Sequence, residues 1–533
     1  MSSVLIDSFA GIMPKLSPDL LPTNAAQIAV DCYLGRGVLS ASKNPLATAI
    51  TLLPTTKTIY WFHKTANGGD GFWFQFNSEV DVVRGQIAND ANVRTYMTGV
   101  NNDRPLYTTA TLAQSHSPYP TLTRWLGLPT PDAPIAAGPI GSPPTGGKAI
   151  TTSYYMTYIS DLGEESAPSP ASNIVDRWDS SSVALSGLSI PSGQFNIVTK
   201  RIYRIELAGV FEFVADIPVA TTVFTDDVDT ESLGAPCPSE TWDAPNANMR
   251  GLLALPNGVM MGFWGNTIAL CESYLPHAWP VNYRLALDYD VVGAAMSAYG
   301  VIVVTAGNPY LLSGSSPGSM QAIKLDVVQA GVSKRSVVDM GDYVLYASSD
   351  GLVAAGGKQA QLMTADHITP EQWRKLFFPS TIHAYRWDNR YLAFYDNGAG
   401  GGAFSFSPDE GFRLFSQYAD CGYVDDQSGV LYIKQGTLLK KWGVGDAANY
   451  VWKSKKMRVS VNDTFAACKV LAENYPVQVF IFSEGGLLKN INVMSKKAFR
   501  LPTNRKHNDY EIMVSGSNTV RSVQLASSMS EIL

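Results

Sequence analysis

The pattern that most invites a catalytic interpretation is Gly314-Ser-Ser-Pro-Gly318, which matches the G-x-S-x-G of hydrolase nucleophile elbows. In such an elbow the residue after the serine donates its backbone N–H to the oxyanion of the transition state. Here that residue is Pro317, which has no N–H, and no strand-to-helix pattern surrounds it. The motif therefore predicts a turn, and no catalytic residue is expected in the chain.

Metal chemistry has weak candidates. Asp226-Asp-Val-Asp-Thr-Glu231 has carboxylates at spacings that a calcium loop could use, but it lacks the central glycine and distal glutamate of an EF-hand, which favours a solvated turn. The six histidines form no H-x-x-x-H pair, and His277, between two prolines, is expected to be a packed structural residue. The five cysteines form no C-x-x-C pair, which favours reduced, mostly buried thiols at Cys32, Cys237, Cys271, Cys421 and Cys468. We expect no metal and no cofactor.

Anion binding is a third possible chemistry, because basic residues are concentrated near the end of the sequence. From Val451 to the end the chain has 12 lysines and arginines against 6 acidic residues, whereas the first 450 residues have 28 against 40. Phosphate contacts need only charge and reach, so DNA and an acidic partner protein are equally suitable ligands, and a merely solvated face is the simpler alternative. The candidate contact residues are Lys453, Lys455, Lys456, Arg458, Lys496, Lys497 and Arg500, with Arg505 and Lys506 beside them.

The composition indicates the kind of scaffold that positions these residues. Of 533 residues, 45% are hydrophobic and only 16% are charged, with 45 glycines and 31 prolines, a balance that favours short strands and many turns. The sequence thus predicts an all-β protein. No basic segment followed by an apolar run opens the chain, and no run of about 18 apolar residues occurs, so we expect synthesis in the cytoplasm and no membrane insertion.

A repeat begins after Met249. A turn, an apolar strand, a second turn and a second strand recur every 40 to 48 residues. A β-propeller blade requires such a unit, because stacked blades bury each other's faces. The repeated first strands lie at 259–264, 301–304, 343–346, 390–395 and 430–433.

An earlier sheet adds to these blades. Its four expected strands lie at 58–63, 71–76, 80–84 and 105–109. The total is then six blades, with seven as the alternative. The ring would close if the N-terminal segment paired with the last blade. Thr369 and Pro370 predict a capped helix turn inserted among the blades.

Composition also sets the domain boundaries. The stretch from Gly127 to Gly147 is rich in proline and glycine and is expected to be a linker. Strands expected at 153–159, 182–185, 199–205, 211–216 and 222–225 describe an Ig-like sandwich that resembles a fibronectin type III module. The predicted fold is a β-propeller with an inserted Ig/fibronectin-III-like β-sandwich and a C-terminal β-rich domain. The predicted segments are an arm with the first propeller part (1–128), the linker (129–147), the sandwich (148–240), the remaining blades (241–452) and a basic β domain (453–533).

The first forty residues have their own pattern. Pro14, Pro18 and Pro22 predict an extended stretch over 15–21, followed by a brief helix over 25–31 and a first strand at Val38-Leu39. Phe9-x-Gly-Ile12 followed by these prolines resembles the start of the tail nozzle or hub proteins of short-tailed bacteriophages, also labelled virion or DNA-stabilisation proteins. Further resemblance lies in the segments 276–280 (PHAWP), 499–502 (FRLP), 512–516 (IMVSG) and 525–528 (LASS).

The resemblance implies a structural virion protein of a phage tail. Copies would form a ring, by analogy a homohexamer, below the portal and adaptor, enclosing the channel that retains packaged DNA and passes it during ejection. The implied partners are other copies of the chain, adaptor or portal proteins, tail fibres or a needle, and channel DNA without sequence specificity. Phe9, Ile12, Leu16 and Leu21 would form an arm that latches the ring or reaches a neighbouring subunit. The alternatives are a propeller protein that binds or hydrolyses glycans and a bacterial interaction scaffold.

Overall fold

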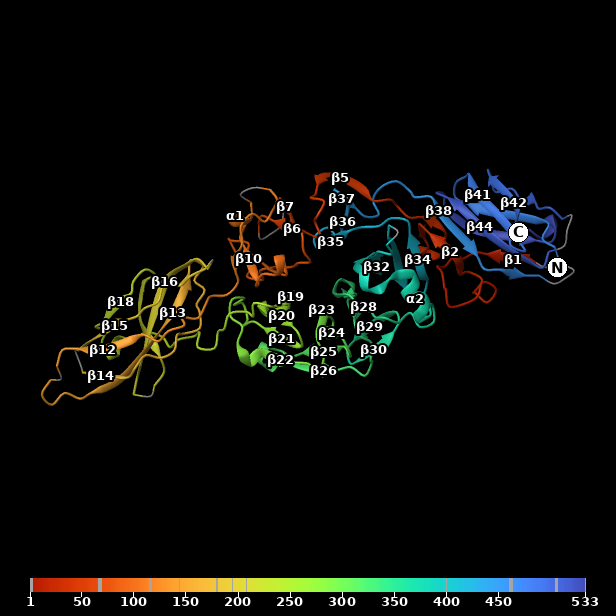
Figure 1. The fold of residues 1–533 in the computed structure, drawn as a ribbon. Helices are drawn as coiled ribbons and strands as arrows, with labels where there is room; N and C mark the ends of the chain where they lie inside the picture. The colour runs from red at the N-terminus through yellow and green to blue at the C-terminus, as the bar shows by residue number, and fades with distance from the viewer. Residues whose placement is uncertain are drawn as a thin grey trace. The chain divides into compact units, whose positions relative to one another are not determined.

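The computed structural model describes residues 3–532 except 66–69, 115–116, 143, 179–180, 194, 208, 399, 460–463 and 504–506. The described chain consists of small β-sheets, with two α-helices, α1 (Ala110–Ala113) and α2 (Pro370–Phe377) (Figure 1). The all-β class expected from composition is therefore confirmed. The chain divides into two units, one of residues 1–59, 292–312 and 323–533 and the other of residues 60–291 and 313–322.

Several sheets have four antiparallel strands that pair in chain order, which is the strand order of a propeller blade. Two lie at β8 (Asp81–Arg84), β9 (Thr95–Thr98), β10 (Leu106–Thr108), β11 (Arg124–Trp125), and at β19 (Arg250–Ala254), β20 (Met260–Trp264), β21 (Thr267–Leu270), β22 (Arg284–Ala286). The next two are β23 (Val291–Ser297), β24 (Gly300–Thr305), β25 (Tyr310–Ser313), β26 (Gln321–Lys324), and β27 (Val338–Asp339), β28 (Val344–Ala347), β29 (Leu352–Gly356), β30 (Gln359–Leu362). A further four strands, β31 (His383–Trp387), β32 (Arg390–Tyr395), β33 (Gly402–Ser407) and β34 (Gly411–Phe415), pair in the same way inside a larger sheet.

One more four-stranded sheet takes its last strand from the start of the chain. Its strands β35 (Cys421–Val424), β36 (Leu431–Gln435) and β37 (Leu438–Lys441) continue into β5 (Leu46–Thr51). The register pairs Lys441 with Leu46 and Leu438 with Thr51. An N-terminal segment therefore does pair with the last repeat, but it is β5 and not the opening stretch expected there; β1 (Ser3–Ile6) and β2 (Ala26–Val30) of the opening stretch pair with other strands.

The sequence repeat captured the middle of each sheet. The two strands expected in every unit are the second and third of the four, for example β24 and β25 or β28 and β29. These central strands are nearly continuous apolar runs because neighbouring sheets cover them. Ile302 and Val304 of one sheet, for instance, share a core cluster with Val344 and Val353 of the next. The outer strands are more exposed and give a weaker pattern, as in β30.

The sheet expected near residue 60 is divided into two. β6 (Thr58–His63) pairs with β7 (Gly71–Phe76), while β8 belongs to the separate sheet β8–β11. The unrecognised strand β9, which is buried along its whole length, pairs with β8 and β10. Phe62 and Phe74 stack at 5.0 Å between ring centroids and join the core beside this sheet. The prediction of one sheet with four strands is therefore wrong in its pairing.

The inserted sandwich has two sheets around one core. One sheet orders β12 (Ala136–Ile140), β15 (Ser182–Ser186) and β18 (Val223–Asp226); the other orders β14 (Val175–Arg177), β13 (Ile150–Ser160), β16 (Ile197–Glu206) and β17 (Glu212–Pro218). The five expected strands are all present. The linker prediction over 129–147 needs correction, because β12 lies within it; Pro139 is tolerated there since β12 is an edge strand.

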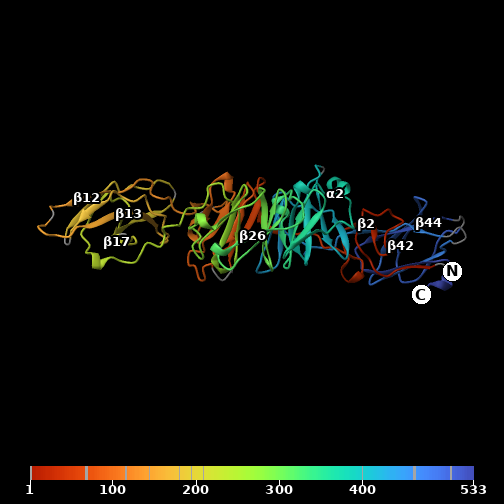
Figure 2. The ribbon, with the colours of Figure 1, turned by 90° about the horizontal axis from the view of Figure 1, so that it is seen from below.

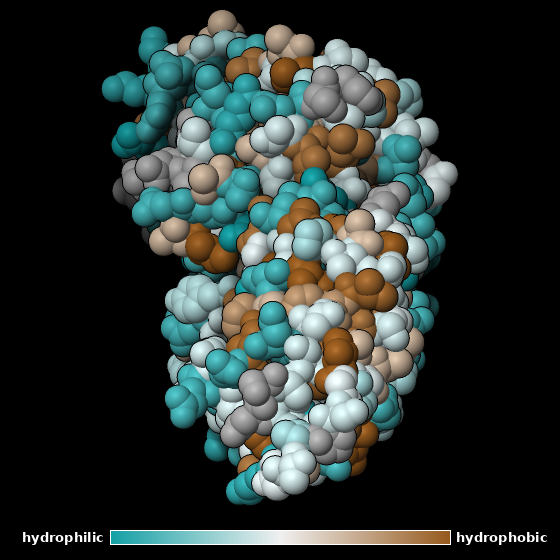
Figure 3. All heavy atoms as spheres, turned by 90° about the vertical axis from the view of Figure 1, so that its left-hand side faces the viewer, coloured by the Kyte–Doolittle hydropathy of each residue, from teal (hydrophilic) through white to brown (hydrophobic). Residues whose placement is uncertain are grey.

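The face drawn in Figure 3 shows hydrophobic residues interspersed with hydrophilic ones.

Strands from the two ends of the chain share the same sheets. β1 (Ser3–Ile6) pairs with β45 (Val520–Ala526), which continues to β40 (Ala467–Ala472) and β43 (Phe499–Arg500). β2 (Ala26–Val30) lies between β34 and β38 (Tyr450–Ser454), and the sheet goes on through β44 (Asp509–Gly516), β41 (Val477–Ser483) and β42 (Gly486–Val493). Figures 1 and 2 show the red N-terminal segment among the blue C-terminal strands. The smaller strands here are β3 (Cys32–Tyr33), β4 (Ser40–Ala41) and β39 (Met457–Arg458).

Two local predictions for the start of the chain are wrong. The stretch 25–31 contains a strand, β2, because hydrogen bonds to β38 outweigh the helix preference of its alanines. The proline-rich stretch forms two turns rather than an extended strand, with Leu16 N donating to Met13 O and Leu20 N to Ser17 O. The helix turn expected at Thr369 is confirmed, since the side chain of Thr369 accepts from Gln372 N at the start of α2.

Candidate functional site

The serine of the elbow-like motif is a structural cap. Ser316 precedes a short 3₁₀ turn, Pro317–Ser319, and its Oγ hydrogen-bonds Ser319 Oγ at 3.0 Å. Within the described part of the chain the hydrogen bonds of Ser316 are to Ser319, and neither a histidine nor a carboxylate is hydrogen-bonded to it. A nucleophilic serine needs a base within hydrogen-bonding reach, so the prediction of a turn is confirmed.

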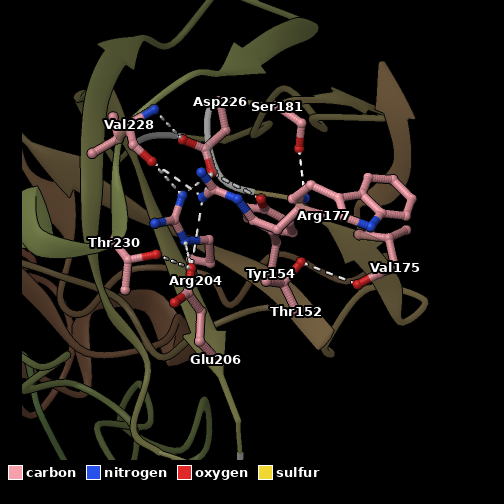
Figure 4. Close-up of polar contacts among 11 residues, drawn as sticks. Thr152, Tyr154, Val175, Arg177, Ser181, Arg204, Glu206, Asp226, Val228 and Thr230 are labelled. Atoms are coloured by element: carbon pink, nitrogen blue, oxygen red, sulfur yellow. Dashed lines mark hydrogen bonds and ion pairs between the residues drawn. The ribbon is translucent and has the colours of Figure 1, made fainter. Parts of the chain in front are cut away.

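The acidic segment after β18 is anchored by an ion pair (Figure 4). Asp226 Oδ2 accepts hydrogen bonds from Arg204 Nη1 at 2.6 Å and from the hydroxyl of Tyr154 at 2.8 Å. Neither Asp226 nor Arg204 has any exposed area. The prediction of a solvated turn is therefore wrong for Asp226, although Asp227 and Asp229 are exposed. Among the described residues no group of His, Cys, Asp and Glu could hold a metal ion.

Two further charges complete this cluster. Glu206 Oε1 lies 2.9 Å from Arg204 Nε and 3.6 Å from Arg177 Nη1. The carbonyl of Val228 accepts from Arg204 Nη1 and Arg177 Nη1, at 2.9 and 3.1 Å. Two buried cations thus face two carboxylates, and burial is tolerated because each charge has a partner. The cluster fixes the loop after β18 to β16 and β14, which is a structural role.

The histidine and cysteine predictions are also supported by burial. His277 is 5% exposed, lies edge-on to Trp242 at 5.7 Å, and has its pKa lowered to about 4 by burial. The five cysteines are unpaired and four are buried. Burial raises the pKa of Cys271 to about 12 and that of Cys421 to about 11, so these thiols stay protonated at neutral pH.

The structure separates the predicted basic residues into two groups. Three of them form ion pairs within the chain. Lys453 Nζ lies 2.8 Å from Glu511, Lys456 Nζ 3.6 Å from Asp509 and Arg458 Nη2 2.7 Å from Asp19. Their charge is largely compensated, so these residues are poor candidates for contacts with DNA or another protein.

The second group has uncompensated charge. Lys496 and Lys497 lie between β42 and β43, and Arg500 lies on β43, the edge strand of its sheet. All three are exposed, and within the described residues none has an ion-pair partner. We call them the basic edge. Lys455 is half-buried and also lacks an ion-pair partner there. Arg505 and Lys506 lie outside the described residues.

The predicted arm is packed within its own chain. Phe9, Ile12 and Leu21 are buried, and Leu16 is half-buried. Ile12 N donates to Phe412 O at 2.8 Å, which pins the segment to β34. These side chains therefore already pack against other parts of the same copy, and their predicted contact with a neighbouring subunit stays a prediction.

A groove with several uncommitted polar groups was missed by sequence reasoning. It has a volume of about 490 Å³, and its lining includes Tyr299 and Tyr343. Each tyrosine lies in or beside the turn that precedes a repeated strand, β24 or β28. That shared position in consecutive repeats is the only sequence signal that points to the groove. Nothing local shows that the two turns meet.

Comparisons with known proteins identify no relative. No family model matches the sequence, and no curated protein matches it. The CNH domain of AfRom2 is a similar solved structure, with 6% identity, a TM-score of 0.24, and coverage of 59% of this chain and 90% of that chain. The N-terminal domain of Nup159 has 12% identity, a TM-score of 0.22, and coverage of 52% and 91%. PorZ, an essential bacterial surface component of the type-IX secretion system of Porphyromonas gingivalis, has 12% identity, a TM-score of 0.28, and coverage of 90% and 71%.

These similarities are too weak to transfer a function. All three TM-scores are below 0.5 and all three identities are below 25%. In the part of the chain that the structure describes, no helix is both long and apolar enough to cross a membrane. A function for this chain is therefore inferred from its own residues.

Proposed function

We propose that this chain is a structural subunit of a phage tail, without enzymatic activity. In this proposal the blade-like sheets close into a propeller, and copies of the chain form a ring, by analogy a hexamer, below the portal and adaptor. The ring encloses the DNA channel, retains packaged DNA and passes it during ejection. Tail fibres or a needle would be further partners in the virion.

The observation that carries this proposal is that the first and last segments of resemblance pack into one core, since Phe9 and Leu525 belong to the same cluster of buried residues. The N-terminal strand β1 pairs with β45, and the register aligns Val4 with Leu525. Leu525 opens the last segment of resemblance, and Phe9 belongs to the first. Motifs separated by some five hundred residues therefore serve one module, which favours a common origin over independent coincidences.

The chemistry of the described residues favours a structural role. Each pattern that could carry catalysis has a structural explanation, as a cap at Ser316, an ion pair at Asp226 or a packed ring at His277. An acidic body suits a channel wall, since repulsion of phosphates favours passage over adhesion. The basic edge suits a contact with an adaptor or with DNA.

Electron microscopy of the purified protein tests the proposal. Negative-stain images should show rings with a central opening, and mass photometry should give the mass of several copies of the chain, by analogy six. A protein that stays monomeric in both measurements, alone and with capsids that lack this protein, would contradict the proposal and favour a bacterial interaction scaffold.

A further inference from the structure

We propose that the groove beside Tyr299 binds a neutral sugar unit of a glycan. The groove lies within one unit of the chain, and the residues that define the proposal are Tyr299, Tyr343, Asp326, Asp342, Lys358 and Gln359. This inference does not depend on the proposed ring or on the phage resemblance.

The groove is formed where the turns of two neighbouring sheets meet. Tyr299 lies in the turn between β23 and β24, and Ala298 N donates to Gly341 O at 2.9 Å, which ties this turn to the next sheet. On that sheet, Asp342 and Tyr343 precede β28, and Lys358 lies in the turn between β29 and β30. Backbone pairing therefore sets the position of the two walls.

Two glycines bring the backbone close to the two tyrosines of the groove. A Cβ on Gly356 would lie 2.9 Å from both Asp342 O and Tyr343 Cβ, so a larger residue would not fit there without a shift. Gly357 has a positive φ of 55°, and a Cβ on it would lie 3.8 Å from the Tyr299 ring. The Tyr299 ring thus extends over a bare backbone turn and remains 61% exposed.

The lining has the chemistry that pyranose recognition needs. A sugar ring presents an apolar face of C–H groups that packs on an aromatic ring, and it presents hydroxyls at its rim that need acceptors and donors. Tyr299 offers the exposed ring. The carboxylates of Asp326 and Asp342, the ammonium of Lys358 and the amide of Gln359 offer hydrogen-bonding groups with no protein partner among the described residues.

The charge of the groove lining favours neutral sugars over acidic ones. The two carboxylates exceed the single ammonium, so the groove is acidic overall. A carboxylate held against acidic groups is disfavoured, which predicts rejection of uronic acids and of sialic acid.

Saturation-transfer NMR on the full chain tests the proposal. The probes are maltotriose, cellotriose and chitotriose as neutral trimers, trigalacturonate as the acidic trimer, and an array of bacterial surface glycans to find the preferred sugar. We expect at least one neutral glycan to bind and trigalacturonate not to bind. Absence of binding across the trimers and the array would overturn the proposal, and so would a preference for the acidic trimer.

Two substitutions locate the binding. Tyr299→Ala should weaken the affinity about five- to tenfold, because it removes the stacking surface. Asp342→Asn should weaken it as well, and because both side chains are largely exposed the melting temperature should not change. Tyr274→Ala is the matched control, since Tyr274 is also exposed and packs over a glycine, Gly258, but lies outside the groove. Equal affinity of Tyr299→Ala and Tyr274→Ala would overturn the proposal.

Discussion

Phe9 lies edge-on to Trp452, with ring centroids 4.9 Å apart and ring planes at 82°. The indole Nε1 of Trp452 donates to Ala10 O at 3.0 Å, so a hydrogen bond and an aromatic contact join the same two segments. Both rings are almost fully buried. The start of the chain is therefore part of the C-terminal core.

Phe9→Ala should destabilise this core by about 3 kcal/mol, because it removes a buried aromatic ring and leaves a cavity beside Trp452. Hydrogen exchange of the β38 amides in the full chain measures the effect locally. Leu20→Ala is the control, since Leu20 is 69% exposed and should change little. Deletion of residues 1–24 should increase the exchange more than Phe9→Ala does. If exchange and assembly are both unchanged in the deletion, this segment stabilises neither the core nor the assembly.

Gly11→Ala should be at least as damaging as Phe9→Ala. A Cβ on Gly11 would lie 2.1 Å from Phe412 O, which is a backbone atom and therefore has little freedom to move. The hydrogen bond from Gly11 N to Glu410 O, 2.7 Å long, would be strained or lost. Gly138→Ala is the control, because nothing lies within 4 Å of its added Cβ. A melting temperature that is equal in the two variants would contradict the close approach.

Asp226→Asn should destabilise the sandwich by about 3 kcal/mol, because it removes one of two carboxylates and leaves the buried Arg204 and Arg177 to share the remaining one, Glu206. Asp216→Asn is the matched control. Asp216 pairs with Arg201 at 2.7 Å, but both residues are partly exposed, and loss of such a pair costs less than about 1 kcal/mol. Hydrogen exchange of β16 and β18 amides in the two variants separates the effects. Similar exchange in both would show that burial does not strengthen the first pair.

Glu164→Gln should alter the pH dependence of stability. Glu164 is buried, its Oε1 lies 3.8 Å from Arg94 Nη1, and burial raises its pKa to about 7. The folded protein thus holds this proton more tightly than the unfolded chain does. Stability from this group is present at low pH and is lost as the pH rises towards and through 7.

The expected size of that effect is about 3 kcal/mol between pH 5 and pH 8. Thermal unfolding of the wild type and of Glu164→Gln at both pH values measures it: the variant should gain stability relative to the wild type as the pH rises. Glu231→Gln, at an exposed position, should parallel the wild type. A constant difference between wild type and Glu164→Gln would show that the Glu164 carboxyl titrates normally.

Replacing the basic edge with alanine should weaken binding to duplex DNA or to an acidic partner. For DNA, loss of Lys496, Lys497 and Arg500 should reduce the slope of log affinity against log salt by about 3, since each phosphate contact contributes about 0.9. Fluorescence anisotropy over a salt series measures the slope. The matched control replaces Lys453, Lys456 and Arg458, which are ion-paired within the chain. If the control triple lowers the slope as much as the basic-edge triple, the basic edge has no special role.

The sequence alone predicted those features that depend only on residues near one another in the chain. The central strands of each repeat, such as β24 and β28, are apolar runs between turns, and their positions were predicted. The capped start of α2 was predicted because Thr369 and Pro370 act within one helical turn. The prediction of unpaired, mostly buried cysteines is confirmed, with four of the five buried, because their wide spacing in the sequence already argued against disulfides and a zinc site.

Only the tertiary structure decided features that depend on distant partners. The stretch that became β2 has the alanines of a helix, and its strand form depends on β38, more than four hundred residues away. The sequence predicted a solvated Asp226, but in the fold its carboxylate is buried and paired with Arg204 and Arg177. Likewise, Lys453 and Lys496 are the same residue type, and only the position of Glu511 shows that one charge is compensated and the other is free. Strand pairing and ion pairing are contacts across space, so the sequence alone determined which residues could make them and the fold determined which residues do.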